Sequence, residues 1–241
     1  MDPSTDSLER LVPEALDADD STGLDTLALH LARYEFAARF ARSGARILDM
    51  ACGVGYGTRL LADRSSGSAL GVDLSEEAIS HARRSYAREG VDFAVADALE
   101  FGEPAGYDLV VSLETVEHVD DPVRLMRRLL ELVRPGGVLV ASVPTTPSTD
   151  VNPHHQSDFT RASFRAMLRD TPAREIDQLF QVQRVPIGGV LMRSEKRMAD
   201  MRPNLLAYYA THPGSLLRRL ASTLRHGFAN HYLTLAWRHE A

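Results

Sequence analysis

The sequence contains one cysteine, one lysine and one tryptophan among its 241 residues, and no long apolar run. A single cysteine excludes a disulfide framework within the chain, which favours a reducing cytoplasm as its location. No run approaches the roughly 18 apolar residues of a membrane span, and the acidic N-terminal region lacks the pattern of a signal peptide. We find no internal repeat and no low-complexity tract. A globular protein without a membrane partner is therefore expected.

Charge is distributed unevenly along the chain. Residues 1–183 hold 18 basic and 30 acidic residues, a net charge of −12, whereas residues 184–241 hold 9 and 3, a net charge of +6. The arginine-rich C-terminal part fits either a solvated helical face or a lid over an anionic substrate. The acidic main body argues against nucleic acid as a partner, because nucleic-acid-binding domains present a basic surface.

Strand-like and helix-like segments alternate through the middle of the chain. Five short apolar segments have the length and composition of strands, and helical patterns separate several of them. The predicted strands are 46–50, 68–74, 91–97, 107–113 and 134–144. This alternation predicts an α/β fold, with a parallel sheet covered by helices on both faces. Ligands of such sheets bind beyond the carboxyl ends of the strands.

A glycine-rich turn follows the first predicted strand, in the segment ILDMACGVGYGT at 47–58. Gly53, Gly55 and Gly57 allow a tight turn and a close approach of ligand to backbone. The spacing differs from the dinucleotide fingerprint G-x-G-x-x-G. Asp73 ends the next strand, where a carboxylate can accept both hydroxyls of a ribose, and Asp97 ends the third, where it can accept from an adenine amino group. These residues predict a nucleotide-cofactor site, with ordinary strand-end acids as the alternative.

These segments resemble motifs I to VI of class I S-adenosylmethionine-dependent methyltransferases, in order and at fitting spacing. The resemblance covers about residues 45–185 and includes YDLVVSLETVEHV and LLELVRPGGVLVASVP. It implies a Rossmann-like doubly wound sheet of seven strands, with an antiparallel last strand. It also implies S-adenosylmethionine as the cofactor. The residues expected to contact this cofactor are Tyr34, Asp49, Ala51, Gly53, Gly55, Asp73, Leu74, Asp97, Ala98 and Leu113.

An amphipathic helix is expected before the first strand, over 24–42, with Gly44 ending it. Its His-x-x-Arg-Tyr pattern, at His30, Arg33 and Tyr34, resembles a subgroup often found with glycan-modifying enzymes. Tyr34 is expected to cover the cofactor, and a core position on the helix is the alternative.

The chain is accordingly divided into three parts. Residues 1–44 form an arm and a helix covering the cofactor, and 45–185 form the core, which ends with a helix and a strand over 161–185. Residues 186–241 are expected to be mostly helical over 190–226, as a lid, a substrate-binding segment or a homodimer contact. An edge strand is expected over 231–239.

Ionisable residues gather after the fourth predicted strand, in SLETVEHVDDP. Within one helical turn, the spacing of Glu114, Glu117 and His118 would place them on one face. The stretch NPHHQSDFT follows the fifth strand, whose carboxyl end faces the same mouth, and supplies His154 and His155. Mixed oxygen and nitrogen ligands suit Mn²⁺, Fe²⁺, Co²⁺ or Zn²⁺, with Mg²⁺ also permitted.

This E-x-x-E-H pattern with a distant histidine resembles two groups of enzymes. One is the small-RNA 2′-O-methyltransferases, in which a metal gathers the vicinal hydroxyls of a terminal ribose. The other is the ubiquinone-biosynthesis O-methyltransferases, which act on catechols. The resemblance implies Glu114, Glu117, His118 and His155 as ligands of a divalent metal. The alternatives are a metal-free site with His118 as general base, with His154 as a second candidate, and a purely structural role.

The leading prediction is a metal-assisted O-methyltransferase that acts on a hydroxyl of a sugar, glycoside or other small natural product. A divalent ion lowers the pKa of a hydroxyl and holds two oxygens in place. The sulfonium methyl is already activated, so positioning is the remaining task. The alternatives are a metal-free N- or C-methyltransferase of a small molecule, an RNA 3′-end 2′-O-methyltransferase, and a cofactor-binding protein without catalysis.

Overall fold

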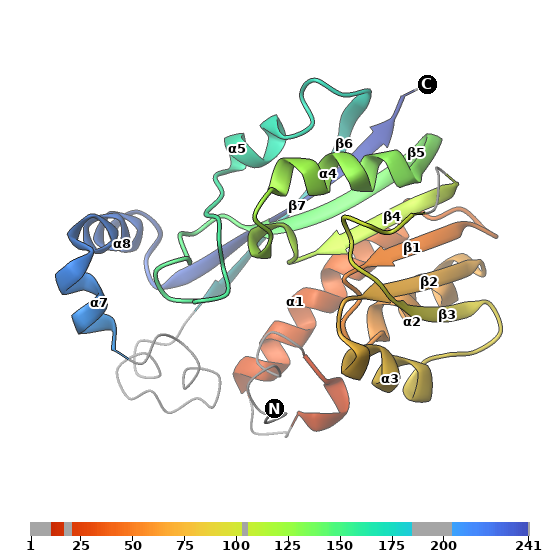
Figure 1. Ribbon diagram of the computed structural model, residues 1–241, viewed down its shortest axis with the longest axis horizontal. Helices are drawn as coiled ribbons and strands as arrows, with labels where there is room; N and C mark the ends of the chain where they lie inside the picture. The colour runs from red at the N-terminus through yellow and green to blue at the C-terminus, as the bar shows by residue number, and fades with distance from the viewer. Residues whose placement is uncertain (1–10, 17–20, 103–105, 185–203, 241) are drawn as a thin grey trace.

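A seven-stranded sheet forms the centre of the computed structural model, which describes residues 11–16, 21–102, 106–184 and 204–240. The strand order is β3-β2-β1-β4-β5-β7-β6 (Figure 1). The strands are β1 Arg46–Met50, β2 Ser68–Asp73, β3 Val91–Val95, β4 Tyr107–Leu113, β5 Val133–Pro144, β6 Ala173–Arg184 and β7 Ala229–His239. The first five pair in parallel, and β7 runs antiparallel to β5 and to β6. The predicted Rossmann-like fold with an antiparallel last strand is confirmed.

The prediction of an edge strand over 231–239 was wrong, because β7 lies between β5 and β6. Alternating apolar and polar residues indicated a strand with one solvated face. In the structure Leu233, Leu235, Ala236 and Trp237 are all buried, so both faces of this strand are covered. The edge position belongs to β6, whose burial pattern is more exposed than that of β7.

Helices precede, connect and follow the strands, and several begin at a capping residue. The helical elements are η1 Pro13–Ala15, α1 Ser21–Ala38, α2 Tyr56–Ser65, α3 Glu76–Ser85, η2 Val116–His118, α4 Pro122–Leu132, α5 Arg161–Ala166, α7 Leu205–Thr211 and α8 Pro213–His226. The side chains of Ser75, Asp121 and Thr160 accept hydrogen bonds from the first turns of α3, α4 and α5. Part of the predicted lid, 186–203, lies outside the described residues.

The N-terminal helix α1 ends earlier than its sequence pattern predicts. The amides of Arg39, Phe40 and Ala41 each donate to the carbonyl three residues before, which tightens the chain into turns after Ala38. Gly44 then adopts a left-handed conformation, with φ of 74°.

Two apolar layers cover the sheet because its buried strands present side chains alternately to each face. Leu48 and Met50 pack with residues of α4 and α5, whereas Ile47 and Leu109 pack with residues of α1, α2 and α3. Figure 1 shows α4 lying across β4 and β5, with which it makes contact. Among the described helices, none combines the length and the apolar character that crossing a membrane requires.

The carboxyl ends of β1 and β4, which are neighbours in the sheet, are followed by non-glycine residues in left-handed conformations. Ala51 has φ of 61° and Glu114 has φ of 52°. Such conformations cost free energy and tend to be retained at functional sites. In Figure 1 the α7–α8 pair lies beyond one end of the sheet, and the connection from β5 to α5 approaches it.

Candidate active site at the carboxyl ends of the strands

A cavity of about 1190 Å³ opens at the carboxyl ends of β1, β2 and β4 and extends to α7 and α8. This volume exceeds the roughly 300–1,000 Å³ of pockets for a single drug-sized ligand, so it suits a cofactor together with an acceptor. Most of the residues predicted to contact a cofactor line it. They are Tyr34, Ala51, Gly53, Asp73, Leu74, Asp97, Ala98 and Leu113.

The carboxylate of Asp73 is held in place by backbone donors at the cavity wall. The amide of Gly53 donates to Oδ2 at 2.9 Å, and the amide of Ser75 donates to Oδ1 at 2.9 Å. A carboxylate offers about four acceptor positions, so these two bonds orient it without exhausting it. Asp97 is similarly fixed, since its Oδ1 accepts from the amide of Leu99 at 2.8 Å. Both carboxylates therefore fit a ligand that presents hydroxyl and amino donors, as a nucleoside does.

The glycines of the turn have different roles. A methyl group added at Gly53 would meet nothing within 4 Å, so open space for a ligand lies above this residue. At Gly55 it would lie 2.7 Å from Ala82 and Phe93, and at Gly57 it would overlap the ring of Tyr34 at 1.9 Å. Gly55 does not line the cavity. Close packing between elements explains it and Gly57, whereas ligand access explains Gly53.

Asp49 lies beneath the cavity and not in its wall. It is fully buried, and its Oδ2 accepts hydrogen bonds from Thr58 Oγ1 at 2.6 Å and from the hydroxyl of Tyr34 at 3.3 Å. Burial raises the pKa of Asp49 to about 7, although the hydrogen bonds from the two hydroxyl groups act to lower this pKa. Tyr34 is itself 5% exposed, so it both packs in the core and lines the cavity.

Asp49 makes the stability of the cofactor-free protein depend on pH. Its pKa is about 7 in the folded protein and 3.8 ordinarily, so the unfolded state loses this proton first as the pH rises. The free energy of unfolding is therefore highest below pH 3.8 and falls as the pH rises through about 7. Each pKa unit corresponds to about 1.4 kcal/mol, so the loss is of the order of 4 kcal/mol. We expect Asp49→Asn to unfold at higher denaturant concentration than wild type at pH 8, with the difference vanishing near pH 4. Denaturant unfolding at both pH values measures this, and a difference independent of pH contradicts it.

Three of the four predicted metal ligands come together in the cavity wall. Glu117, His118 and His155 each offer a ligand atom, and these atoms all lie within 4.8 Å of one another. His118 Nδ1 donates to the carbonyl oxygen of His154 at 3.2 Å, which leaves the lone pair of the ring on Nε2. His155 Nδ1 lies 2.6 Å from Ser148 Oγ. Outer partners of this kind orient histidines that bind metals.

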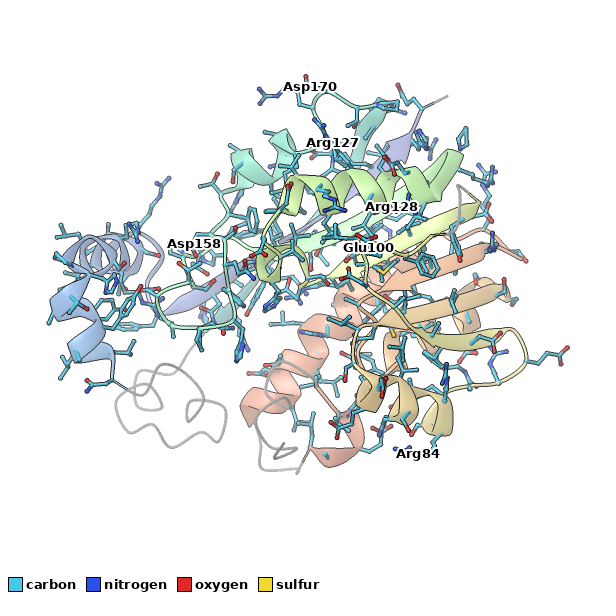
Figure 2. The ribbon with its side chains drawn as sticks, viewed as in Figure 1. Arg84, Glu100, Arg127, Arg128, Asp158 and Asp170 are labelled. Atoms are coloured by element: carbon cyan, nitrogen blue, oxygen red, sulfur yellow. The ribbon has the colours of Figure 1, made fainter. Side chains whose placement is uncertain are left out.

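Hydrogen bonds to backbone carbonyls join the two segments that carry these ligands. The amide and side chain of Gln156 donate to the carbonyls of Glu117 at 2.8 Å and His118 at 3.0 Å. Asp158, on the connection from β5 to α5 (Figure 2), accepts from the amides of Ser148 at 2.7 Å and Thr149 at 3.1 Å. The group is therefore positioned by the chain itself, which favours binding of a cation without rearrangement.

Glu114, the fourth predicted ligand, is not brought into this group. Its left-handed backbone precedes a 3₁₀ turn that starts at Val116, so the expected single helical face does not form. Its Oε1 accepts from Ser142 Oγ at 2.7 Å and lies 3.7 Å from Arg33 Nη1. Arg33 is 1% exposed, and its Nε donates to Gln181 at 2.8 Å. Glu114 thus compensates a buried cation.

The side chain of His154 is exposed and does not line the cavity; its carbonyl is what contacts His118. Sequence reasoning did not select Ser148, Tyr232 or Arg219, all of which line the cavity. Contacts between distant segments place Tyr232 and Arg219, whereas Ser148 contacts His155 within one connection. The predicted substrate-binding segment over 186–241 includes Tyr232 and Arg219 but singles out neither residue.

Comparisons with known proteins relate this chain to methyltransferases. Residues 48–141 match the family model described as "Methyltransferase domain". Over 147 residues the chain is 31% identical to a "Probable S-adenosylmethionine-dependent methyltransferase" of Mycolicibacterium smegmatis, covering 58% of this chain and 56% of that protein. Over 157 residues it is 31% identical to the ubiquinone biosynthesis O-methyltransferase of Xanthomonas campestris, covering 56% and 65%.

A solved structure gives the same fold. Phosphoethanolamine N-methyltransferase 2 of Haemonchus contortus, in complex with S-adenosyl-L-methionine, superposes with a TM-score of 0.59 at 20% identity, over 88% of this chain and 53% of that chain. This chain matches between 53% and 65% of the length of these relatives. The family match includes the glycine-rich turn, Asp73, Asp97 and His118, and it ends before His155.

Proposed function

We propose that the core of this chain is a class I S-adenosylmethionine-dependent methyltransferase domain and that the protein is a metal-assisted O-methyltransferase. The family match over residues 48–141 and the methyltransferase relatives support the first part. The acceptor class is a small molecule with vicinal hydroxyls, such as a sugar, a glycoside or a catechol. One observation carries the proposal: Glu117, His118 and His155 gather in the same cavity as the Asp73 carboxylate. The relative that acts in ubiquinone biosynthesis and is called an O-methyltransferase supports oxygen as the acceptor atom.

The residues divide into a cofactor end and an acceptor end. Asp73 and Asp97 would hold the ribose and adenine of the cofactor, and Gly53 leaves room for the rest. Glu117, His118 and His155 would hold a divalent cation, whose chemistry is to lower the pKa of a bound hydroxyl and to fix two oxygens. Such a donor set of one carboxylate and two imidazoles suits Mn²⁺, Fe²⁺, Co²⁺ or Zn²⁺, and leaves room for oxygens of the acceptor.

Methyl transfer then needs little beyond alignment. A bond forms between the acceptor oxygen and the methyl carbon as the bond from that carbon to the sulfonium sulfur breaks. The hydroxyl proton is released to solvent water, and S-adenosylhomocysteine remains with a neutral thioether sulfur. The hydrogen bonds of Gln156 with Glu117 and His118 hold together the loops that carry the ligands, and they would help to orient the acceptor. Orientation contributes much of the rate in reactions of this kind.

A metal-free reaction is the second candidate, and one contact favours it. Because Nδ1 of His118 donates to the carbonyl of His154, Nε2 carries the lone pair and is the nitrogen that can accept a proton. Since His118 lines the cavity, this nitrogen suits a general base that removes a proton from oxygen, nitrogen or carbon.

Methyl transfer to matched probes separates the two candidates. Chelator-treated protein would be supplied with S-adenosylmethionine and either 3,4-dihydroxybenzaldehyde or 4-hydroxybenzaldehyde, with and without Mg²⁺ or Mn²⁺. We expect methylation of the diol alone, at least tenfold faster with metal, and a higher metal requirement in His155→Ala. Equal rates with and without metal, or equal rates for both probes, would contradict metal assistance and favour the metal-free base.

A further inference from the structure

The charges that line the cavity are divided between its two ends. Five acidic residues line it: Asp73, Asp97, Glu114, Glu117 and Asp120. Among the lining residues of the described part of the chain, Arg219 is the sole arginine or lysine. It lies on α8, whereas the acids follow strands of the sheet. The acidic end suits a cationic cofactor and a metal ion, and the end at α8 suits a group of the opposite sign.

The guanidinium of Arg219 is held in the wall by a backbone carbonyl. Its Nη1 donates to the carbonyl oxygen of Pro147 at 3.2 Å, and it forms no ion pair with a described carboxylate. A guanidinium has five N–H donors, so after one bond to a carbonyl it can still donate two parallel hydrogen bonds to an oxyanion. Arg33 provides the contrast, because it is buried beside Glu114 and does not line the cavity.

A neighbouring pair fixes the surface on which Arg219 lies. The hydroxyl of Tyr209, on α7, donates to Asp150 Oδ2 at 2.7 Å, and Asp150 is 4% exposed. This bond joins α7 to the same connection that Arg219 contacts at Pro147, so the α7–α8 pair is attached at two points. These two contacts therefore hold the helix pair that carries Arg219 against the connection between β5 and α5.

The anchor point of Arg219 is next to the group of metal ligands along the chain. Pro147 accepts from Arg219, and the following residue, Ser148, contacts His155 Nδ1 at 2.6 Å. An anion bound by Arg219 and a hydroxyl held at His155 would thus belong to one compact molecule. Leu220 and Phe228 line the same end and provide apolar contact for its body.

We infer that Arg219 is a specificity-determining residue that binds an anionic group, a carboxylate or a phosphate, on the acceptor. The acceptor is then a polyhydroxylated acid or a sugar phosphate. This inference rests on the proposed function for the identity of the reacting hydroxyl, but the binding of the anion can be tested separately.

Calorimetry on the protein saturated with S-adenosylhomocysteine and Mn²⁺ tests the inference with two matched pairs of probes. The carboxylate pair is 3,4-dihydroxybenzoate and its methyl ester, and the phosphate pair is glucose 6-phosphate and glucose. We expect the anion of at least one pair to bind at least tenfold more tightly than its neutral partner. The pair that shows the preference identifies which oxyanion the subsite takes.

Variants of adjacent arginines provide the control. Arg219→Gln is expected to abolish the preference and Arg219→Lys to keep part of it. Arg218→Gln removes the same charge from the preceding residue of α8. Arg218 contacts Ser215 and does not line the cavity, so this variant is expected to keep the full preference. Thermal unfolding checks that the variants remain folded. Equal binding within both pairs, no binding of either anion, or a preference that survives in Arg219→Gln would overturn the inference.

The outcome is separable from that of the proposed function. A preference for the anion without methyl transfer would retain the subsite and reject the O-methyltransferase. Methyl transfer to neutral diols, with no preference for the anion in any pair, would retain the O-methyltransferase and reject the subsite. If the acid is turned over, Arg219→Gln is expected to raise KM at least tenfold and to change kcat less.

Discussion

Asp73→Ala is expected to lower the affinity for S-adenosylhomocysteine by at least about 100-fold. Hydrogen bonds to a charged group contribute about 1.5–3 kcal/mol each, and in the proposed site the ribose would present two hydroxyls to this carboxylate. The substitution also removes the acceptor that fixes the amides of Gly53 and Ser75, so the turn beside the cofactor loses its support. Calorimetric titration of S-adenosylhomocysteine into wild type and variant measures the effect.

Asp92→Ala is the matched control for this change. Asp92 is an exposed acid on β3 and does not line the cavity. Its loss removes one negative charge from the strand that pairs with β2, and affinity is expected to stay within about twofold, as for a surface substitution. Thermal unfolding separates a loss of binding from a loss of fold. Unchanged affinity in a folded Asp73→Ala protein would remove Asp73 from the cofactor site.

His118→Ala is expected to lower kcat/KM by at least about 100-fold. Both candidate mechanisms need this imidazole, as a metal ligand or as a base, and a positioned base alone contributes about 100–10,000-fold. The contact between Nδ1 and the carbonyl of His154 holds the ring so that Nε2 carries the lone pair. Steady-state rates with the best diol probe measure the loss.

His154→Ala is the comparison, because the two histidines are close but differ in exposure. The side chain of His154 is exposed, and its backbone carbonyl, which holds His118, remains in the variant. We expect a rate within about threefold of wild type. Partial recovery of His118→Ala in excess Mn²⁺ indicates a ligand, whereas recovery by added imidazole alone indicates a base. A rate for His118→Ala near that of wild type would contradict both mechanisms.

The sheet and the cofactor end of the site could be predicted because their signals are local. Parallel strands separated by helices place all their carboxyl ends at one edge, so Asp73 and Asp97 had to lie near the glycine-rich turn. Strand lengths and caps such as Ser75 follow from short stretches of sequence. The position of β7 did not follow, because alternation along one strand does not specify how many neighbours it pairs with.

The acceptor end was less predictable because it depends on long-range contacts and on one backbone conformation. The spacing of Glu114, Glu117 and His118 suggested a shared face, but the left-handed conformation of Glu114 removes it from the group. Local sequence carries no signal for a non-glycine residue in that conformation. The contacts of His118 with the carbonyl of His154, and of Arg219 with Pro147, join segments whose meeting only the fold determines.

Metal binding by the protein saturated with S-adenosylhomocysteine tests the central claim most directly. Chelator-treated protein would be titrated by calorimetry with Mg²⁺, Mn²⁺, Co²⁺ and Zn²⁺, with Glu117→Gln and Glu114→Gln as matched variants. We predict saturable one-to-one binding of at least one cation, weakened at least tenfold in Glu117→Gln and kept in Glu114→Gln, since only Glu117 belongs to the group of ligands. Absence of binding by every cation, or equal affinity in wild type and Glu117→Gln, would contradict a metal-assisted enzyme.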